Sequence, residues 1–248
     1  MIEYSTSEVA GIIGVHANTV RLYESIGFIT PPKRKSNGYR VYTEKQIYQM
    51  KLARTAMRAE VLQNGLRSQA VKIVRLFASM NVEASLRASE EYCTMIDDEI
   101  SRANNAVTAV EEILAQQACE NDVFLTRMQA AKTLGVTSET LRNWERNGLI
   151  KLRRKSNGYR VYSQEDMRKL TIIRTLRCAN YSLSSILRLM NSLCNGDNTT
   201  IEGVLNTPSP DEDIVSVCDR LLVSLNATKS DACEVIELIR NFENKPST

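Results

Sequence analysis

Residues 34–42 read Arg-Lys-Ser-Asn-Gly-Tyr-Arg-Val-Tyr, and the same nine residues occur again, letter for letter, at positions 154–162. The Asn-Gly pair is typical of two-residue hairpin turns, because both central positions of such a turn require a positive φ. The Tyr-Arg-Val-Tyr that follows is aromatic, β-branched and alternating, as strands are. The sequence therefore predicts a β-hairpin, and predicts it twice.

Positive charge concentrates at the tip and approach of each predicted hairpin. The cations are Lys33, Arg34, Lys35 and Arg40 in the first copy and Lys151, Arg153, Arg154, Lys155 and Arg160 in the second. A cationic β-ribbon of this size fits the backbone or groove of a nucleic acid. For one isolated copy, a solvated surface hairpin is the alternative.

Two short helices are predicted before each hairpin. In the first copy they span residues 7–15, closed by Gly14, and residues 17–26, stopped by Gly27. The same plan recurs from Leu125 onward, with Gly135 in the place of Gly14. A helix, a Gly-containing turn and a second helix form the arrangement that sets one helix into the major groove of DNA.

Further helices are predicted to begin directly after each hairpin. Thr43 with Gln46, and Ser163 with Asp166, have the spacing of a capping box, in which Asp166 is a shorter substitute for Glu or Gln. These starts extend each repeat beyond the hairpin and make the expected fold mainly α.

The distribution of charge divides the chain into four parts. Residues 1–81 carry a net charge of +7, 82–122 carry −8, 123–196 carry +10 and 197–248 carry −6. We interpret the basic parts as two winged helix-turn-helix domains that bind a polyanion. The acidic parts are then two spacers, the second of which includes a linker.

Both spacers show apolar residues at alternating spacings of three and four. The seam positions are Cys93, Ile96, Ile100, Ala103, Val107, Val110, Leu114 and Gln117, and then Cys218, Leu221, Leu225, Thr228, Ala232, Val235, Ile239 and Phe242. This spacing predicts two long coiled-coil helices, the second beginning near residues 209–212. We expect them to pair antiparallel within one chain, so that a monomer imitates a dimer. A homodimer, or helices that each pack on their own domain, are the alternatives.

Composition excludes several classes of protein. The 248 residues are 43% hydrophobic and 25% charged, as in ordinary globular domains. We expect neither export nor a membrane span, hence a cytoplasmic protein with reduced thiols. With one histidine, no Cys-x-x-Cys pair and no Gly-rich phosphate loop, we expect no enzyme, no cofactor and no metal site.

Three further stretches carry a family resemblance. Residues 15–28 read Val-His-Ala-Asn-Thr-Val-Arg-Leu-Tyr-Glu-Ser-Ile-Gly-Phe, and residues 136–149 read Val-Thr-Ser-Glu-Thr-Leu-Arg-Asn-Trp-Glu-Arg-Asn-Gly-Leu. Residues 176–186 read Leu-Arg-Cys-Ala-Asn-Tyr-Ser-Leu-Ser-Ser-Ile, whereas residues 57–66 of the first copy depart from that pattern. With the hairpins as wings, the chain resembles the MerR family of bacterial transcription regulators. It departs from the usual plan by carrying two such domains.

The resemblance implies double-stranded promoter DNA as a partner and RNA polymerase as another. In relatives the bound promoter is bent and untwisted when an effector binds, so a small-molecule effector is also implied. Two alternatives stay open. One is an effector-free architectural or excisionase-like DNA-binding protein; the other is a sensor of a ligand or second messenger, with a pocket between the long helices and the DNA-binding domains. Sensing of thiol oxidation or of a metal by Cys93, Cys119 and Cys218 is one form of this sensor alternative.

The resemblance also assigns site residues. The residues at positions that hold the DNA backbone are Arg21, Arg34, Lys35, Tyr39 and Arg40, and Arg142, Arg154, Lys155, Tyr159 and Arg160. Tyr23 and Trp144 either touch that backbone or pack the helix against the wing. The residues expected to face the groove floor are His16, Ala17 and Asn18 in one copy and Thr137, Ser138 and Glu139 in the other. Because they differ in hydrogen-bonding chemistry, we expect an operator with two unlike half-sites.

Overall fold

The protein is described from a computed structural model. The structure describes residues 2–58, 64–116, 124–153, 160–195, 200–208 and 217–243. It divides into two compact units, one formed by Met1–Asp98 with Leu225–Thr248 and the other by Glu99–Ser224. We call these unit 1 and unit 2. The division falls inside a long helix, so each unit holds one predicted DNA-binding domain together with parts of the spacers.

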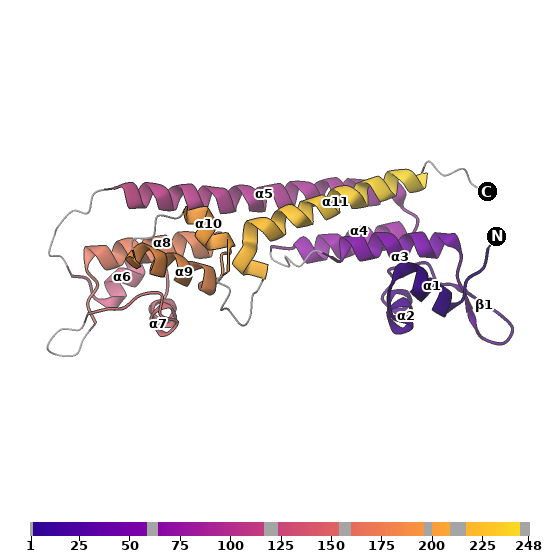
Figure 1. Ribbon diagram of the computed structural model, residues 1–248, viewed down its shortest axis with the longest axis horizontal. Helices are drawn as coiled ribbons and strands as arrows, with labels where there is room; N and C mark the ends of the chain where they lie inside the picture. Colours follow the sequence, from indigo (N-terminus) through magenta and orange to yellow (C-terminus); the bar gives the residue numbers. More distant parts are fainter. Residues whose placement is uncertain are drawn as a thin grey trace. The chain divides into compact units, whose positions relative to one another are not determined.

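Unit 1 is built almost entirely from helices (Figure 1). Its elements are α1 (Thr6–Ile13), α2 (Ala17–Ser25), β1 (Lys33–Arg34), β2 (Arg40–Val41), α3 (Glu44–Ala56), α4 (Leu66–Ala78), the first half of α5 (Val82–Ala115) and most of α11 (Leu221–Glu243). The sequence signals act as predicted. Gly14 ends α1 in the left-handed region at φ 69°, and Thr43 with Gln46 forms the capping box that starts α3. The helix-turn-helix is therefore confirmed in this copy.

The predicted hairpin is present, but its turn is of another type. Strands β1 and β2 pair antiparallel with Arg34 opposite Arg40. Lys35 N donates to Tyr39 O at 2.9 Å and Gly38 N donates to Lys35 O at 2.8 Å, so the loop has three residues. Gly38 has a φ of 83°, and Asn37 is not among the residues with positive φ. The expected two-residue turn with two positive φ angles is therefore wrong; a turn with one left-handed Gly replaces it.

The core of unit 1 ties the recognition helix to the wing and to α3. Its buried members are Val9, Ala10, Val20, Ile29, Tyr42, Ile47 and Met50. Tyr42 lies at the base of the wing, where its main chain bridges to Tyr4 at the start of the domain. The wing base is therefore anchored by burial, and the exposed tip extends from it.

Unit 2 repeats this plan. Its elements are the second half of α5, α6 (Arg127–Leu134), α7 (Ser138–Arg146), α8 (Gln164–Cys178), α9 (Leu183–Asn195), α10 (Ile201–Asn206), the 3₁₀ turn η1 (Val217–Arg220) and the first turn of α11. Ser163 and Asp166 form the predicted capping box of α8. Leu125 bridges to Tyr162 as Tyr4 does to Tyr42. The tip of this wing, residues 154–159, lies outside the described residues.

The two long helices differ in length. Helix α5 has 34 residues, whereas α11 has 23. Residues 217–220 form a 3₁₀ turn, so the expected continuous α-helix through Cys218 is wrong. The turn is held from outside, because Ser182 Oγ donates to Asp219 Oδ1 and Arg188 Nη2 donates to Asp219 O. The predicted start at 209–212 lies outside the described residues.

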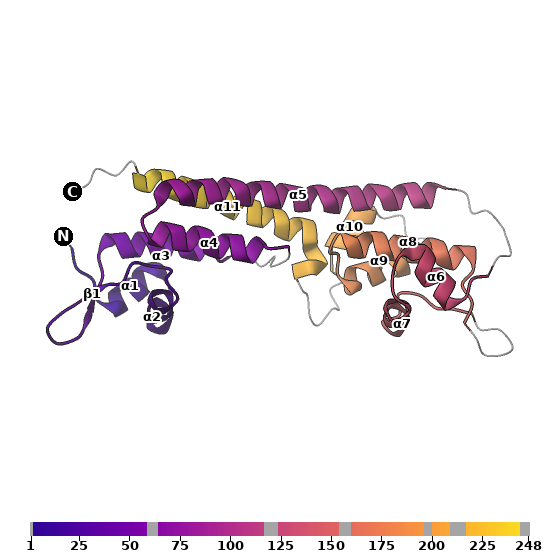
Figure 2. The ribbon, with the colours of Figure 1, turned by 180° about the vertical axis from the view of Figure 1, so that it is seen from behind.

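In unit 1, α11 runs antiparallel to the first half of α5 (Figures 1 and 2). Lys229 Nζ lies 2.6 Å from Asp97 Oδ1, and farther along α11 Arg240 Nη2 lies 3.9 Å from Glu90 Oε1. In this unit the buried seam positions are Ile96 on α5 and Leu225, Thr228, Ala232, Val235 and Ile239 on α11. Parts of the two spacers thus pack together within one chain, as expected.

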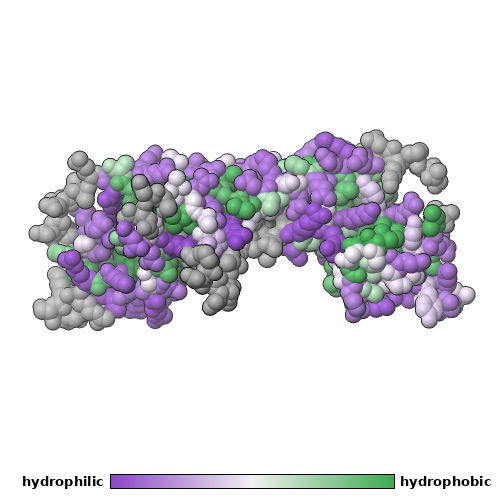
Figure 3. All heavy atoms as spheres, viewed as in Figure 1, coloured by the Kyte–Doolittle hydropathy of each residue, from purple (hydrophilic) through white to green (hydrophobic). Residues whose placement is uncertain are grey.

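The described helices include none that is long and apolar enough to cross a membrane. On the face shown in Figure 3, hydrophilic residues cover most of the surface of each unit, with apolar residues in smaller groups between them.

Candidate nucleic-acid interface

The starts of the two recognition helices, α2 and α7, are capped by different side chains. His16 is the N-cap of α2, where its Nδ1 accepts from Asn18 N at 3.2 Å. Thr137 is the N-cap of α7, where its Oγ1 accepts from Thr140 N at 3.0 Å. His16 and Thr137 are exposed and Ser138 is half-buried. The two predicted reading positions therefore lie at helix starts and carry different groups.

The arginine in the middle of each recognition helix is paired with the residue one turn earlier. Arg21 Nη1 donates to Asn18 Oδ1 at 2.7 Å in α2. Arg142 Nη1 donates to Glu139 Oε2 at 3.0 Å in α7. Arg142 is therefore held by a charged partner and Arg21 by a neutral one. Both arginines are exposed, as a backbone contact requires.

A glutamate on each recognition helix joins that helix to its wing. Arg40 Nε lies 2.5 Å from Glu24 Oε2, and this hydrogen bond raises the pKa of the Arg40 guanidinium. Arg160 Nε pairs in the same way with Glu145. Sequence reasoning missed both glutamates, although their identical placement in the two repeats was a signal. The arginines assigned to DNA phosphates are therefore also ties between wing and helix, and their phosphate contact stays a prediction.

The remaining wing residues lie at the surface. In unit 1, Lys33, Arg34, Lys35 and Tyr39 are exposed, and Tyr39 has 72% of its surface exposed. Arg34 lies 3.9 Å from Glu24, and Lys35 lies 3.6 Å from Glu3. In unit 2, Lys151 and Arg153 are exposed. The predicted contacts Arg154, Lys155 and Tyr159 lie outside the described residues.

The two aromatic candidates divide differently between core and surface. Trp144 has 4% of its surface exposed, so it packs in the core of unit 2. Tyr23 is half-buried, packs against the core of unit 1 and meets Phe28 edge to face at 5.5 Å. Burial raises the pKa of the Tyr23 hydroxyl. Packing is thus the role the structure supports for Trp144, and Tyr23 keeps part of its ring available to a backbone.

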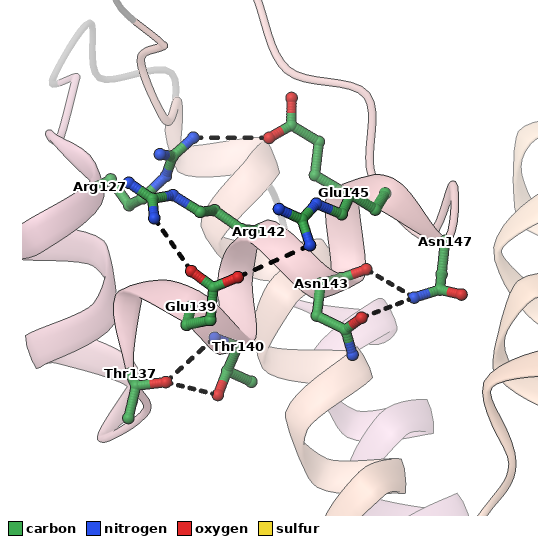
Figure 4. Close-up of polar contacts among 9 residues, drawn as sticks. Arg127, Thr137, Glu139, Thr140, Arg142, Asn143, Glu145 and Asn147 are labelled. Atoms are coloured by element: carbon green, nitrogen blue, oxygen red, sulfur yellow. Dashed lines mark hydrogen bonds and ion pairs between the residues drawn. The ribbon is translucent and has the colours of Figure 1, made fainter.

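Unit 2 also has a concavity of about 390 Å³ that is lined by four arginines and one glutamate: Arg127, Arg142, Arg146, Arg160 and Glu145. Glu145 is the shared partner of two of them, since Arg127 Nη2 lies 3.5 Å from its Oε2. Figure 4 shows Arg127 and Arg142 on the same side of α7, with Glu145 facing Arg127. Sequence reasoning missed both of these arginines: Arg127 lies outside the repeated stretches, and Arg146 lies within residues 136–149 at a position where the first copy has Ser25.

A larger cavity of about 620 Å³ lies elsewhere in unit 2. Leu114 of α5, Leu149, Arg168 and Ile172 of the domain, and Met190 of α9 are among its lining residues. Arg168 closes its α5 side by donating to the carbonyls of Ile113, Leu114 and Gln116 at 2.6–3.0 Å. The cavity lies where the sensor alternative places a pocket, between a long helix and a DNA-binding domain.

The cysteines show a different arrangement from the one considered for metal sensing. Cys119 lies outside the described residues, and the side chain of Cys218 is likewise not described. Cys93 of α5 instead contacts Cys233 of α11 in unit 1, and burial raises the pKa of the Cys93 thiol. Within the described part of the chain, no three His, Cys, Asp or Glu side chains gather as metal ligands would.

Comparisons with known proteins agree with this geometry. A family model described as MerR HTH family regulatory protein matches residues 4–72 and 126–193. The HTH-type transcriptional regulator CueR of Escherichia coli O157:H7 is 44% identical over 50 residues, which cover 20% of this chain and 37% of CueR. The regulator AdhR of Bacillus subtilis is 38% identical over 72 residues, or 29% of this chain and 51% of AdhR. The chain thus matches about half or less of these relatives' lengths.

One solved structure is also similar. It is described as HiNmlR, a MerR family regulator lacking the sensor domain, bound to promoter DNA. The likeness has a TM-score of 0.30 at 25% identity and covers 49% of this chain and 80% of that one.

Proposed function

The chain belongs to the MerR family of helix-turn-helix regulatory proteins, and from that premise we propose that it binds double-stranded promoter DNA and regulates transcription. The observation that carries the proposal is the repeated pairing of recognition helix and wing. In each unit a glutamate of the helix holds an arginine of the wing, Glu24 with Arg40 and Glu145 with Arg160. Helix and wing are thereby fixed together, as a protein that reads a groove and grips the adjacent backbone requires.

The operator has two unlike half-sites in this proposal. The wing sequences are identical, whereas the helix starts present His16 and Asn18 in unit 1 and Thr137 and Glu139 in unit 2. Asn pairs best with adenine, and a carboxylate accepts from the amino group of cytosine. A single chain therefore supplies two different reading heads, and a perfectly symmetric operator would suit only one of them.

The chain acts as a pseudo-dimer that distorts its promoter for RNA polymerase. The support for the pseudo-dimer is the antiparallel packing of α11 on α5 in the same chain, seen in the Lys229–Asp97 contact. A family dimer places this packing between two chains. We propose that here a monomer spans both halves of the operator.

Selection of bound genomic fragments followed by footprinting tests the proposal. Exchanging residues 16–18 with residues 137–139 should reverse the preferred orientation of the operator, while the footprint keeps its length. The unexchanged protein on both orientations is the control. A perfect palindrome bound as tightly as any asymmetric site would count against unlike half-sites. Transcription from a template with an over-long promoter spacer then separates an activator from an architectural protein.

A second candidate function is sensing of a small effector. The 620 Å³ cavity favours it, because its volume is in the range of small-molecule sites and its lining mixes apolar side chains such as Ile172 and Met190 with a few charged ones. A thermal-shift screen tests it, with Met190→Trp as the variant that fills the cavity. A hit that stabilises the original protein and the filled variant equally would speak against this cavity as the site.

A further inference from the structure

The geometry points to a phosphate seat in unit 2 that unit 1 lacks: the concavity of Arg127, Arg142, Arg146 and Arg160 receives a phosphate of the DNA backbone, so the two halves grip DNA unequally. This inference rests on the proposed function and deepens it. It assigns a role to two arginines that neither the repeated motif nor the resemblance singled out.

The first support is the charge of the concavity. Its lining has four guanidinium groups and one carboxylate, Glu145. That carboxylate is half-buried and already occupied by Arg127 and Arg160. Arginine presents several N–H donors in a planar fork that matches a phosphate, so several arginines around one hollow make a strong site for this anion.

The second support is that Arg127 is held in place. Arg127 Nε donates to Tyr162 Oη at 3.2 Å, and the tyrosine is buried with 1% of its surface exposed. Arg127 itself is 22% exposed, so little of its freedom remains to be lost on binding. A positioned guanidinium loses less conformational entropy when it binds an anion than a free one does.

The third support is the comparison between the repeats. The positions of unit 1 that correspond to Arg127 and Arg146 are Thr6 and Ser25, which carry no charge. The other two arginines are retained as Arg21 and Arg40. At these four aligned positions unit 1 therefore has two arginines and unit 2 has four.

Glu139 supplies a counter-ion for the free protein. Its carboxylate lies 3.0 Å from Arg142 and 3.8 Å from Arg146, and all three side chains are more than half exposed. The corresponding residue of unit 1 is the neutral Asn18. A phosphate that enters the seat competes with Glu139 for these arginines, so Glu139 weakens phosphate binding in this unit.

The salt dependence of binding to a random-sequence DNA duplex of about 30 base pairs tests the seat, because phosphate contacts are independent of sequence. The double variant Arg127→Thr, Arg146→Ser gives unit 2 the residues of unit 1. We expect it to bind about tenfold more weakly, with a slope of log K against log salt that is shallower by about 0.9. Arg87→Thr with Arg240→Ser removes two exposed charges from the long helices and is the matched control.

The reverse graft, Thr6→Arg with Ser25→Arg, should steepen the slope by about 0.9. Glu139→Gln should tighten binding at low salt. Circular dichroism checks that each variant is folded, and the reverse graft keeps the test decisive if the first variant is not. A double variant with an unchanged slope, or a control that loses as much, overturns the seat. Failure of the unmodified chain to bind any duplex would instead overturn the proposed function.

Discussion

The hydroxyl of Tyr48 in α3 donates a hydrogen bond to the main-chain carbonyl of Leu238 in α11, at 2.6 Å. In unit 2 the corresponding residue of α8 is Arg168, which donates to the carbonyls of Ile113 and Leu114 in α5. The same position of the repeat thus binds the end of a long helix in both units. In each case the helix comes from the other repeat.

Removal of the Tyr48 side chain should loosen α11 from unit 1. Besides its hydrogen bond, the ring meets Phe242 at 5.2 Å and Phe77 at 6.2 Å. We expect Tyr48→Phe to lower the free energy of unfolding by about 1 kcal/mol and Tyr48→Ala by about 3 kcal/mol. Urea unfolding measures both. Equal losses in the two variants would mean that the aromatic cluster contributes nothing.

Cys93 and Cys233 should be cross-linked within one chain. The two thiols contact each other across α5 and α11, and the thiolate is the form that reacts with a short bifunctional maleimide. Because the pKa of Cys93 is raised, the reaction should speed up as the pH rises. Gel electrophoresis in denaturant should show a compact species that keeps the mass of 27.9 kDa. Cys93→Ser is the control, and a product of twice that mass would place the pairing between chains.

Substitution of Arg40 separates its two roles. As a phosphate contact, Arg40→Ala should weaken binding to all sequences and reduce the salt slope by about 1. Through its ion pair with Glu24, Arg40 also holds the wing against the recognition helix. Glu24→Gln should therefore weaken DNA binding without changing the slope of log K against log salt. Titration of a duplex at several salt concentrations measures both. A changed sequence preference in Arg40→Ala would refute the backbone assignment.

Two buried tyrosines should make stability fall in alkali. Burial raises the pKa of Tyr92 and of Tyr181 to about 12, from an ordinary value of 10.0. A raised pKa stabilises the fold fully below pH 10.0, and this contribution is lost as the pH rises through about 12. In a pH titration of the folded protein, part of the rise in tyrosinate absorbance should therefore occur only near pH 12, and Tyr92→Phe should reduce the size of that part. Simultaneous titration of all tyrosines in the folded protein would contradict this.

The sequence predicted the helices and the wing of unit 1 well because their signals are local. Gly14, the capping box at Thr43 and the repeated wing each determine structure through their neighbours in the chain. The turn type was wrong because Asn-Gly fits more than one loop length, and here Lys35 and Tyr39 close a three-residue loop. A local sequence pattern therefore restricts the possible turn types of a hairpin but does not determine the loop length.

What the sequence did not predict depends on tertiary contacts. The break before α11 arises where Asp219 meets Ser182 and Arg188, residues more than thirty positions away. Arg127 and Arg146 likewise become part of one site only when α6, α7 and the wing come together. Periodicity in the spacer and motif matching in the domain carry no information about either contact.

The exchange of long helices between the repeats limits how the two copies can diverge. If the starts of α2 and α7 read DNA as proposed, a mutation there alters one reading head alone, so each copy is free to acquire its own DNA preference. A mutation in α5 or α11 alters the support of the opposite head as well. Selection on a duplicated gene of this design would therefore allow the two reading heads to diverge in sequence, while the long helices α5 and α11 would have to change together.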